Sequence, residues 1–181
     1  HVSFQIVVTA KVNLTGVQVK FSDLAARHGR ITANEFEVFR ENYVAVPRPS
    51  GNRILTRLYW PDALIPAPLA PAAIPAGQSA VYWCTVQVPP GAVPGTYSGS
   101  YTVSAGSAWV KRSLSLSVGG ERVPMPHFRA NVAVYYPTLR QWYGKNLGKS
   151  YTDEEWAAQK KRYYEFLLRY RLNAYDLPVE W

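Results

Sequence analysis

Apolar and polar residues alternate through the stretch AVYWCTVQVPPGAVPGTYSGSYTV, residues 80–103, and this alternation predicts two β-strands joined by a turn. The first strand, Ala80–Val88, carries apolar residues on both faces, which predicts a place in the middle of a sheet. The second strand, Thr96–Val103, is polar on one face, so we expect that face to meet water. Between them Pro94 fixes φ and Gly95 can adopt φ > 0, as a tight turn requires.

The same period of two continues through most of the first 120 residues. Further strands are predicted at Val2–Thr9, Leu14–Leu24, Ile31–Val46 (one strand or two) and Ala108–Val118. Together they make about seven strands at the spacing of an Ig-like antiparallel β-sandwich, so the chain is predicted to be mainly β. The proline-rich residues 52–78 are expected to form a long ordered loop, and no helical period is seen before residue 150.

The pattern changes after the segment GGERVPMPHF, whose glycines and prolines are typical of a domain junction. We therefore predict a sandwich domain over 1–120, a linker over 121–129 and a second region over 130–181. This region is predicted as strand, helix, strand: Ala130–Tyr136, a helix from Thr152 to about Arg171, and Ala174–Val179. Such a βαβ unit requires a parallel sheet and is typical of the start of a TIM barrel, here incomplete.

The predicted helix carries its own boundary signals. Thr152 and Glu155 have the spacing of a capping box, and Asn173 is a candidate C-cap. An apolar stripe that includes Trp156, Leu167 and Tyr170 would be left uncovered by a lone βαβ unit. We therefore expect the stripe to pack on the sandwich or on another chain, which makes self-association possible, or to need a downstream segment.

Composition narrows the classes of function. The chain has 181 residues and a net charge of +8, but no dense Lys/Arg run interleaved with aromatic residues, which argues against a nucleic-acid partner. No apolar run is long enough to span a membrane. His1, His28 and His127 are too dispersed for a metal site, and no phosphate loop or nucleophile elbow is present, so no metal or cofactor is expected. The single cysteine, Cys84, excludes an internal disulfide and is expected to be a buried, inert thiol. Because the chain opens on a strand in progress, we expect it to be part of a longer protein.

A family resemblance follows from an ordered set of segments. These segments are VSFQIVV, LTGVQVKFSDL, ITANEFEVFRENYV, YWPDALIP, AGQSAVYWCTVQVPPGAVPGTYSGSYTV, LSLSV and VPMP. In this order they resemble the N-terminal β-sandwich of the glycoside hydrolase family 123 group, which contains β-N-acetylgalactosaminidases and relatives sharing the domain of unknown function 4091. The resemblance implies an exported (extracellular or periplasmic) enzyme in which the sandwich precedes a catalytic (β/α)8 barrel. Residues 130–181 would be the barrel's first strand, first helix and second strand.

The same resemblance implies a reaction and a substrate, a glycan that contains N-acetylhexosamine. The 2-acetamido oxygen of the sugar would attack the anomeric carbon, an Asp would orient that amide, and a neighbouring Glu would protonate the leaving oxygen. Both carboxylates belong to a later barrel strand, beyond this chain, so no catalytic residue is assigned here and the chain itself is expected to hydrolyse nothing.

Candidate binding residues come from the ends of the predicted barrel strands, because that edge faces the active site of a barrel. They are Tyr135, Tyr136, Glu180 and Trp181, with the aromatic rings as stacking platforms for a sugar; packing under loops is the commoner reason for aromatic residues at strand ends. The acidic run from Asp153 to Glu155 is interpreted as helix N-terminal chemistry, and Tyr59 with Trp60 as packing of the long loop.

One alternative function is an Ig-like interaction or structural module of a surface protein or filament. Parallel pairing within residues 130–181 favours the hydrolase fragment. Addition of the segment at residues 130–136 to the sandwich as an antiparallel strand favours the module.

Overall fold

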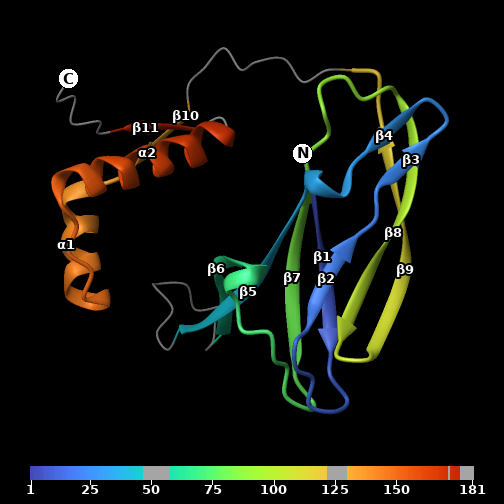
Figure 1. Cartoon of the computed structure of the whole chain (residues 1–181), viewed down its shortest axis with the longest axis horizontal. Helices are drawn as coiled ribbons and strands as arrows, with labels where there is room; N and C mark the ends of the chain where they lie inside the picture. Colours follow the sequence, from blue (N-terminus) through green and yellow to red (C-terminus); the bar gives the residue numbers. More distant parts are fainter. Residues whose placement is uncertain (47–57, 122–129, 171, 176–181) are drawn as a thin grey trace. The chain divides into compact units, whose positions relative to one another are not determined.

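The chain forms two separate compact units, one up to Arg122 and the other from Val123 onward. The computed structural model describes residues 1–46, 58–121, 130–170 and 172–175, and Figure 1 shows its elements. Each unit is described by itself. Of the linker predicted over 121–129, only Glu121 is among the described residues.

The first unit consists of two antiparallel sheets (Figure 1). One sheet has the order β1-β7-β5-β6 and contains β1 (Val2–Thr9), β5 (Phe36–Val46), β6 (Leu58–Pro66) and β7 (Ser79–Val86). The other contains β2 (Gln18–Phe21), β3 (Leu24–Ala26), β4 (Gly29–Ile31), β8 (Gly95–Ala105) and β9 (Ala108–Val118). In this second sheet β9 pairs with one edge of β8, while β2 and β3 pair with the other. Two 3-10 helices, η1 (Ala33–Glu35) and η2 (Ala67–Leu69), connect strands.

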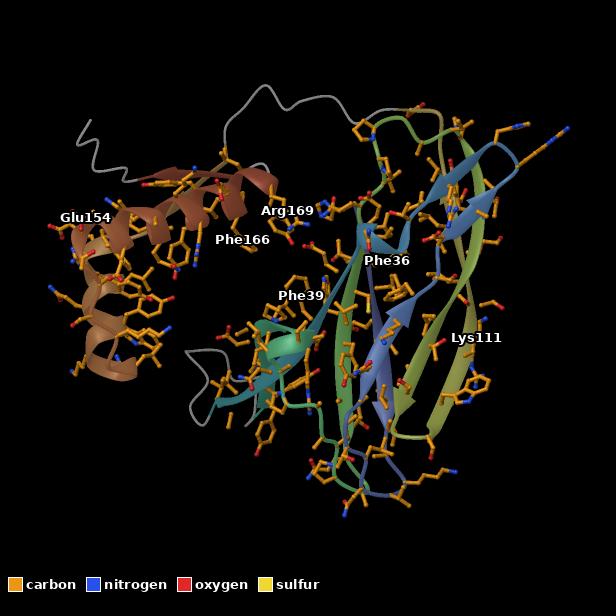
Figure 2. All side chains as sticks on the ribbon, in the orientation of Figure 1. Phe36, Phe39, Lys111, Glu154, Phe166 and Arg169 are labelled. Atoms are coloured by element: carbon orange, nitrogen blue, oxygen red, sulfur yellow. The ribbon has the colours of Figure 1, made fainter. Side chains whose placement is uncertain are left out.

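The alternation of the sequence builds the core between the sheets. β7 lies between β1 and β5, as its two apolar faces predict, and its inward side chains Tyr82, Cys84 and Val86 are buried. Phe21 of β2 stacks on Phe36 of β5 with ring centroids 4.1 Å apart, which joins the two sheets. Figure 2 labels Phe36. The mainly β sandwich fold predicted for this region is confirmed.

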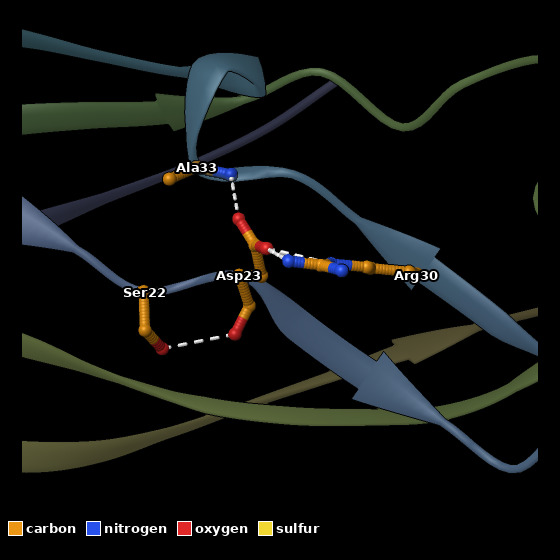
Figure 3. A network of polar contacts seen from close by, with 4 residues as sticks. All are labelled: Ser22, Asp23, Arg30 and Ala33. Carbon is orange, nitrogen blue, oxygen red and sulfur yellow. Dashed lines mark hydrogen bonds and ion pairs between the residues drawn. The ribbon is translucent and has the colours of Figure 1, made fainter.

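A polar cluster lies where β2 passes into β3 along the edge of β8 (Figure 3). Asp23 accepts a hydrogen bond from the Ala33 N–H at 2.6 Å and pairs with the Arg30 guanidinium, while Ser22 Oγ donates to the Asp23 carbonyl at 2.9 Å. The backbone donor from Ala33 and then Arg30 lower the pKa of Asp23. The carboxylate therefore fixes the β3–β4 hairpin to the start of η1.

Several predicted boundaries in the sandwich are wrong. The predicted loop over 52–78 contains β6, which pairs with β5. The prolines of this segment led to the prediction of a loop. β6 is an edge strand, however, and on its open side a residue without an N–H loses no interstrand hydrogen bond. The predicted strand Leu14–Leu24 is also shorter, because only Gln18–Phe21 pairs along β8 before β3 begins at Leu24.

The second unit consists of β10 (Ala130–Ala133), α1 (Tyr136–Leu147), α2 (Asp153–Arg169) and β11 (Leu172–Tyr175). The two strands pair in parallel, from Ala130 opposite Leu172 to Ala133 opposite Tyr175, as the βαβ prediction requires. The expectation of no helix before residue 150 is wrong: α1 starts with Pro137 in its first turn and ends at Gly148, which adopts a φ of 62°. Both are ordinary helix-boundary signals.

The second helix begins as predicted. Thr152 Oγ1 accepts from the Glu155 N–H at 3.2 Å, and Glu155 Oε2 accepts from the Thr152 N–H at 2.9 Å, which completes the capping box. Its end differs, because the C-cap is Tyr170 and Asn173 lies in β11 opposite Asn131. β11 also begins two residues before the predicted Ala174.

Candidate functional site

The carboxyl ends of β10 and β11 define the candidate site. Because the two strands are parallel, both carboxyl ends lie at the same edge of the sheet. In parallel α/β arrangements that edge carries the ligand-binding loops. β10 ends at Ala133, and the chain then runs through Val134 and Tyr135 into α1. This connection is the part of the edge that the structure describes.

The four residues predicted for this edge fall into three situations. Tyr135 is the N-cap residue of α1 and is 67% exposed. Tyr136 is not at a strand end as predicted, because β10 stops three residues earlier; it is the first residue of α1 and is 1% exposed. Glu180 and Trp181 lie outside the described residues. Of the two tyrosines, therefore, Tyr135 has a ring available for stacking on a ligand.

Tyr136 belongs to a cluster of aromatic rings between α1 and α2. Its ring lies 5.4 Å from that of Tyr164 and 6.2 Å from that of Tyr163, centroid to centroid. The hydroxyls of Tyr163 and Tyr143 are 2.6 Å apart and hydrogen bonded. Burial raises the pKa of Tyr163 to about 12 and also raises the pKa of Tyr136. Their ring contacts and the Tyr143–Tyr163 hydrogen bond give these side chains a structural role between α1 and α2.

A hollow of about 260 Å³ opens beside this cluster. It is lined by Tyr136, Pro137, Arg140, Gln141, Trp156 and Lys160. The Arg140 guanidinium pairs with Asp153 at 2.8 Å, donates to the Tyr151 carbonyl, and lies 6.0 Å from the centre of the Trp156 ring. Arg140 therefore fastens α1 to the first turn of α2 and supplies positive charge at the rim of the hollow.

The acidic run at the start of α2 is accounted for by the helix itself. Asp153 pairs with Arg140, Glu155 completes the capping box, and Glu154 lies in the same first turn (Figure 2). Carboxylates at a helix N-terminus offset the helix dipole. These three residues therefore have structural partners or positions, as the sequence indicated.

The described residues offer no cluster of three or more His, Cys, Asp or Glu side chains able to hold a metal ion. Within the same part of the chain, none of the helices has both the length and the apolar composition needed to cross a bilayer. The single cysteine lies far from the candidate edge in sequence and is buried in the sandwich, where burial raises the pKa of its thiol to about 12.

Comparison with known proteins decides the family. Residues 1–105 match the family model described as the glycoside hydrolase 123 N-terminal domain. The chain belongs to this family. Its first strands therefore form the sandwich of a glycoside hydrolase 123 N-terminal domain, as the segment order predicted.

The glycoside hydrolase 123 fold extends over nearly the whole chain. A solved structure of a family 123 glycoside hydrolase from Clostridium perfringens, reported in a study of glycolipid glycan hydrolysis, matches with a TM-score of 0.71 and 21% identity. The match covers 94% of this chain and 30% of that enzyme, so the chain spans less than a third of the enzyme's length. No curated protein sequence matches.

Sequence reasoning missed Arg140 and the rings of α1 because it missed that helix. The signal was present: Pro137 marks a first helical turn, and Gly148 marks a C-cap. Between them the apolar positions are mostly aromatic and the helix is short, so the period of 3.6 is weak.

Proposed function

We propose that this chain is the non-catalytic N-terminal part of an exported glycoside hydrolase that acts on glycans containing N-acetylhexosamine. The observation that supports this most strongly is the family match over residues 1–105. The catalytic Asp–Glu pair is proposed to lie in a later barrel strand, outside these 181 residues. The sandwich would then serve as the support on which the barrel begins.

The second unit supports the barrel part of this proposal. β10 pairs with β11 in parallel through a helical crossover, which is the kind of connection that a (β/α)8 barrel repeats; here the crossover contains two helices, one more than the repeat has. The Ig-like module required the segment at 130–136 to join the sandwich as an antiparallel strand. Residues 130–133 pair in parallel with β11 instead, and Tyr136 begins α1.

The edge of the parallel pair is proposed to face the glycan. Tyr135 is exposed at that edge and offers a flat ring for the apolar face of a sugar. Arg140 and Lys160, which line the neighbouring hollow, offer hydrogen-bond donors to sugar oxygens.

Activity measurements separate this proposal from its alternatives. The 181-residue chain should release no chromophore from a nitrophenyl N-acetyl-β-galactosaminide, whereas the full-length parent enzyme should do so. Turnover by the short chain above background would refute the non-catalytic assignment. A full-length protein inactive on every N-acetylhexosaminide offered would refute the substrate class.

A matched pair of variants tests the binding edge. In the full-length parent, Tyr135→Ala is expected to lower kcat/KM by about two- to twelvefold, because ring stacking contributes about 0.5–1.5 kcal/mol. Trp109→Ala is the control, since Trp109 in β9 is equally exposed at 67%. Equal effects of the two substitutions would contradict a binding role for Tyr135.

Cell fractionation tests export. The full-length parent is expected in the periplasmic or culture fraction, together with a known exported marker. Recovery only with a cytoplasmic marker would refute that part of the proposal.

A further inference from the structure

Glu41 is a buried carboxylate on the outward face of the sheet β1-β7-β5-β6. It is 5% exposed, and each of its oxygens accepts one hydrogen bond, Oε1 from Gln5 Nε2 at 2.5 Å and Oε2 from the Tyr43 hydroxyl at 2.7 Å. The bond to Glu41 raises the pKa of Tyr43. Both partners are neutral, and no Lys or Arg forms an ion pair with Glu41 in the described part of the chain.

Burial of the Glu41 carboxylate costs more free energy than a link between strands requires. Burying a carboxylate without a cation carries a large desolvation penalty, and a neutral amide would bridge Gln5 and Tyr43 at lower cost. A carboxylate has about four acceptor positions, of which the bonds from Gln5 and Tyr43 use two. Glu41 therefore retains capacity to accept hydrogen bonds from a ligand.

The backbone of β6 is irregular where it faces Asn42, the residue that follows Glu41. The β5–β6 register shifts between Glu41 and Tyr43, so that Asn42 alone lies opposite Asp62 and Ala63 and the extra residue is in β6. Ala63 has a φ of 62°, which is uncommon for a residue other than glycine. The Asn42 amide donates to the Asp62 carbonyl at 3.1 Å and holds β5 to this irregular segment. Bulges and strained residues of this kind occur preferentially at functional sites.

A hollow of about 170 Å³ lies at this position, and we name it the Glu41 hollow. Its lining residues are Arg40, Glu41, Asn42, Tyr43, Ile65, Pro71, Ser79, Ala80 and Val81. Its lining residues include one acidic residue, one basic residue and one amide residue beside apolar ones. Arg40 Nη1 donates to the carbonyls of Pro71 and Ala73, while the guanidinium has further N–H donors.

The chemistry of the hollow selects a neutral, hydroxyl-rich ligand. Opposite charges line the same space, so neither a simple cation nor a simple anion is favoured over the other. Donors and acceptors side by side match hydroxyl groups, which both donate and accept. The volume lies below that of drug-sized pockets, which restricts the ligand to about one ring.

We propose that the Glu41 hollow binds a single neutral sugar ring of a glycan, with Glu41 accepting hydrogen bonds from two ring hydroxyls and Asn42 and Arg40 donating to ring oxygens. This site is in the sandwich and is distinct from the Tyr135 edge. The proposal rests on the proposed function only for its choice of sugar as the hydroxyl-rich ligand.

The test is a titration of the isotope-labelled 181-residue chain, followed by NMR. The probes are galactose, N-acetylgalactosamine and glucose, with glycerol as a hydroxylated control without a ring. We expect saturable shifts in the backbone amides of residues 41–43 and in the side-chain amides of Gln5 and Asn42, with at least one sugar and not with glycerol. Absence of saturable shifts there with all three sugars would overturn the proposal.

Variants separate binding from structure. Glu41→Gln keeps the shape and removes the charge, and it is expected to weaken sugar binding at least about tenfold. Asn42→Ala should also weaken binding while leaving the bonds to Glu41 in place, so it keeps the test valid if Glu41→Gln is poorly folded. Glu121→Gln, an exposed carboxylate in the same unit, should bind as the parent chain does.

The outcomes distinguish this site from the proposed function. Sugar-dependent shifts confined to the region of Tyr135 would support the edge of the parallel pair and refute the Glu41 hollow. Shifts at residues 41–43 together with an inactive full-length parent would support the Glu41 hollow and refute the substrate class of the proposed function. Unchanged binding in both Glu41→Gln and Asn42→Ala would also refute the hollow.

Discussion

The contact between Gly29 and Tyr97 allows one steric prediction to be worked out in detail. Tyr97 of β8 is completely buried, and its hydroxyl donates to the Val93 carbonyl at 2.8 Å. A Cβ atom added at Gly29 would lie 2.4 Å from the Tyr97 hydroxyl oxygen, 3.1 Å from Cζ and 3.2 Å from Cε1. The closest of these contacts is impossible without movement, whereas the other two need a shift of a few tenths of an ångström.

The magnitudes follow from this geometry. Overpacking by Gly29→Ala is expected to lower the free energy of unfolding by about 1–3 kcal/mol. Replacing a glycine within a strand offsets up to about 1 kcal/mol of this loss. Tyr97→Phe should cost about 0.5–1.5 kcal/mol for its lost hydrogen bond. In the double variant the contact with the hydroxyl oxygen no longer exists and only the two ring-carbon contacts remain, so Gly29→Ala should then cost much less. The expected coupling energy is about 1–2 kcal/mol, favouring the double variant.

A double-mutant cycle measures the coupling. The four proteins are unfolded in urea, and the sandwich transition is followed through the amide signals of β8 so that unfolding of the second unit does not contribute. Additive effects, with a coupling energy below about 0.3 kcal/mol, would show that the hydroxyl is not the group that excludes a side chain at position 29. Gly16→Ala is not a suitable control, because Gly16 has a φ of 63° and its substitution is strained for a different reason.

Four further predictions address other parts of the chain. Thr152→Ala should lower the free energy of unfolding of the second unit by about 1 kcal/mol while Thr152→Ser retains most of it, as measured by helical circular dichroism during thermal melting; equal losses would contradict the capping box. Gly99→Ala should destabilise the sandwich in urea denaturation, because the new Cβ would lie 2.5 Å from the Asp23 carbonyl oxygen, and no second-site substitution of Leu24 should restore stability. Burial raises the folded-state pKa of Cys84 to about 12, so the stability that the neutral thiol contributes is full below the unfolded thiol pKa of about 8.5 and falls as the pH rises towards 12. In urea titrations over that pH range, Cys84→Ala should therefore lose less stability than the parent chain. Equal losses in the two proteins would refute the raised pKa of Cys84. Phe166 is 54% exposed on α2, so Phe166→Ser should reduce any self-association of the chain that light scattering detects. If the parent chain associates and the variant associates equally, the exposed face of α2 around Phe166 is not the contact.

The sandwich could be predicted from sequence because its strands obey a simple period. β1 and β9 begin and end at the predicted residues, and β7 has the central position that its two apolar faces indicated. The failures occur where local chemistry contradicts the pattern. Pro61 and Pro66 made β6 resemble a loop, although an edge strand tolerates both.

The candidate site was less predictable than the fold, because burial depends on tertiary packing. Nothing in the dipeptide Tyr135–Tyr136 tells which ring is exposed; Pro137 decides it by starting a helix at Tyr136, which places that ring against α2. Glu41 was passed over for a related reason. As one residue of a strand that reads FEVFRENYV, it looks like a solvated charge, and only the β1-β7-β5 order brings Gln5 within reach.

The pairing of β1 with β7 has a consequence for biosynthesis. Val2 lies opposite Val86, so the strand made first must wait for its hydrogen-bonding partner until about 80 further residues have left the ribosome. At ordinary translation rates of about 5–20 residues per second, that delay is roughly 4–16 s. Throughout this interval an apolar segment, VSFQIVV, travels with open backbone groups, while the later β8–β9 hairpin closes within a few residues of its own synthesis. β1 is therefore the strand of this domain that most needs a chaperone.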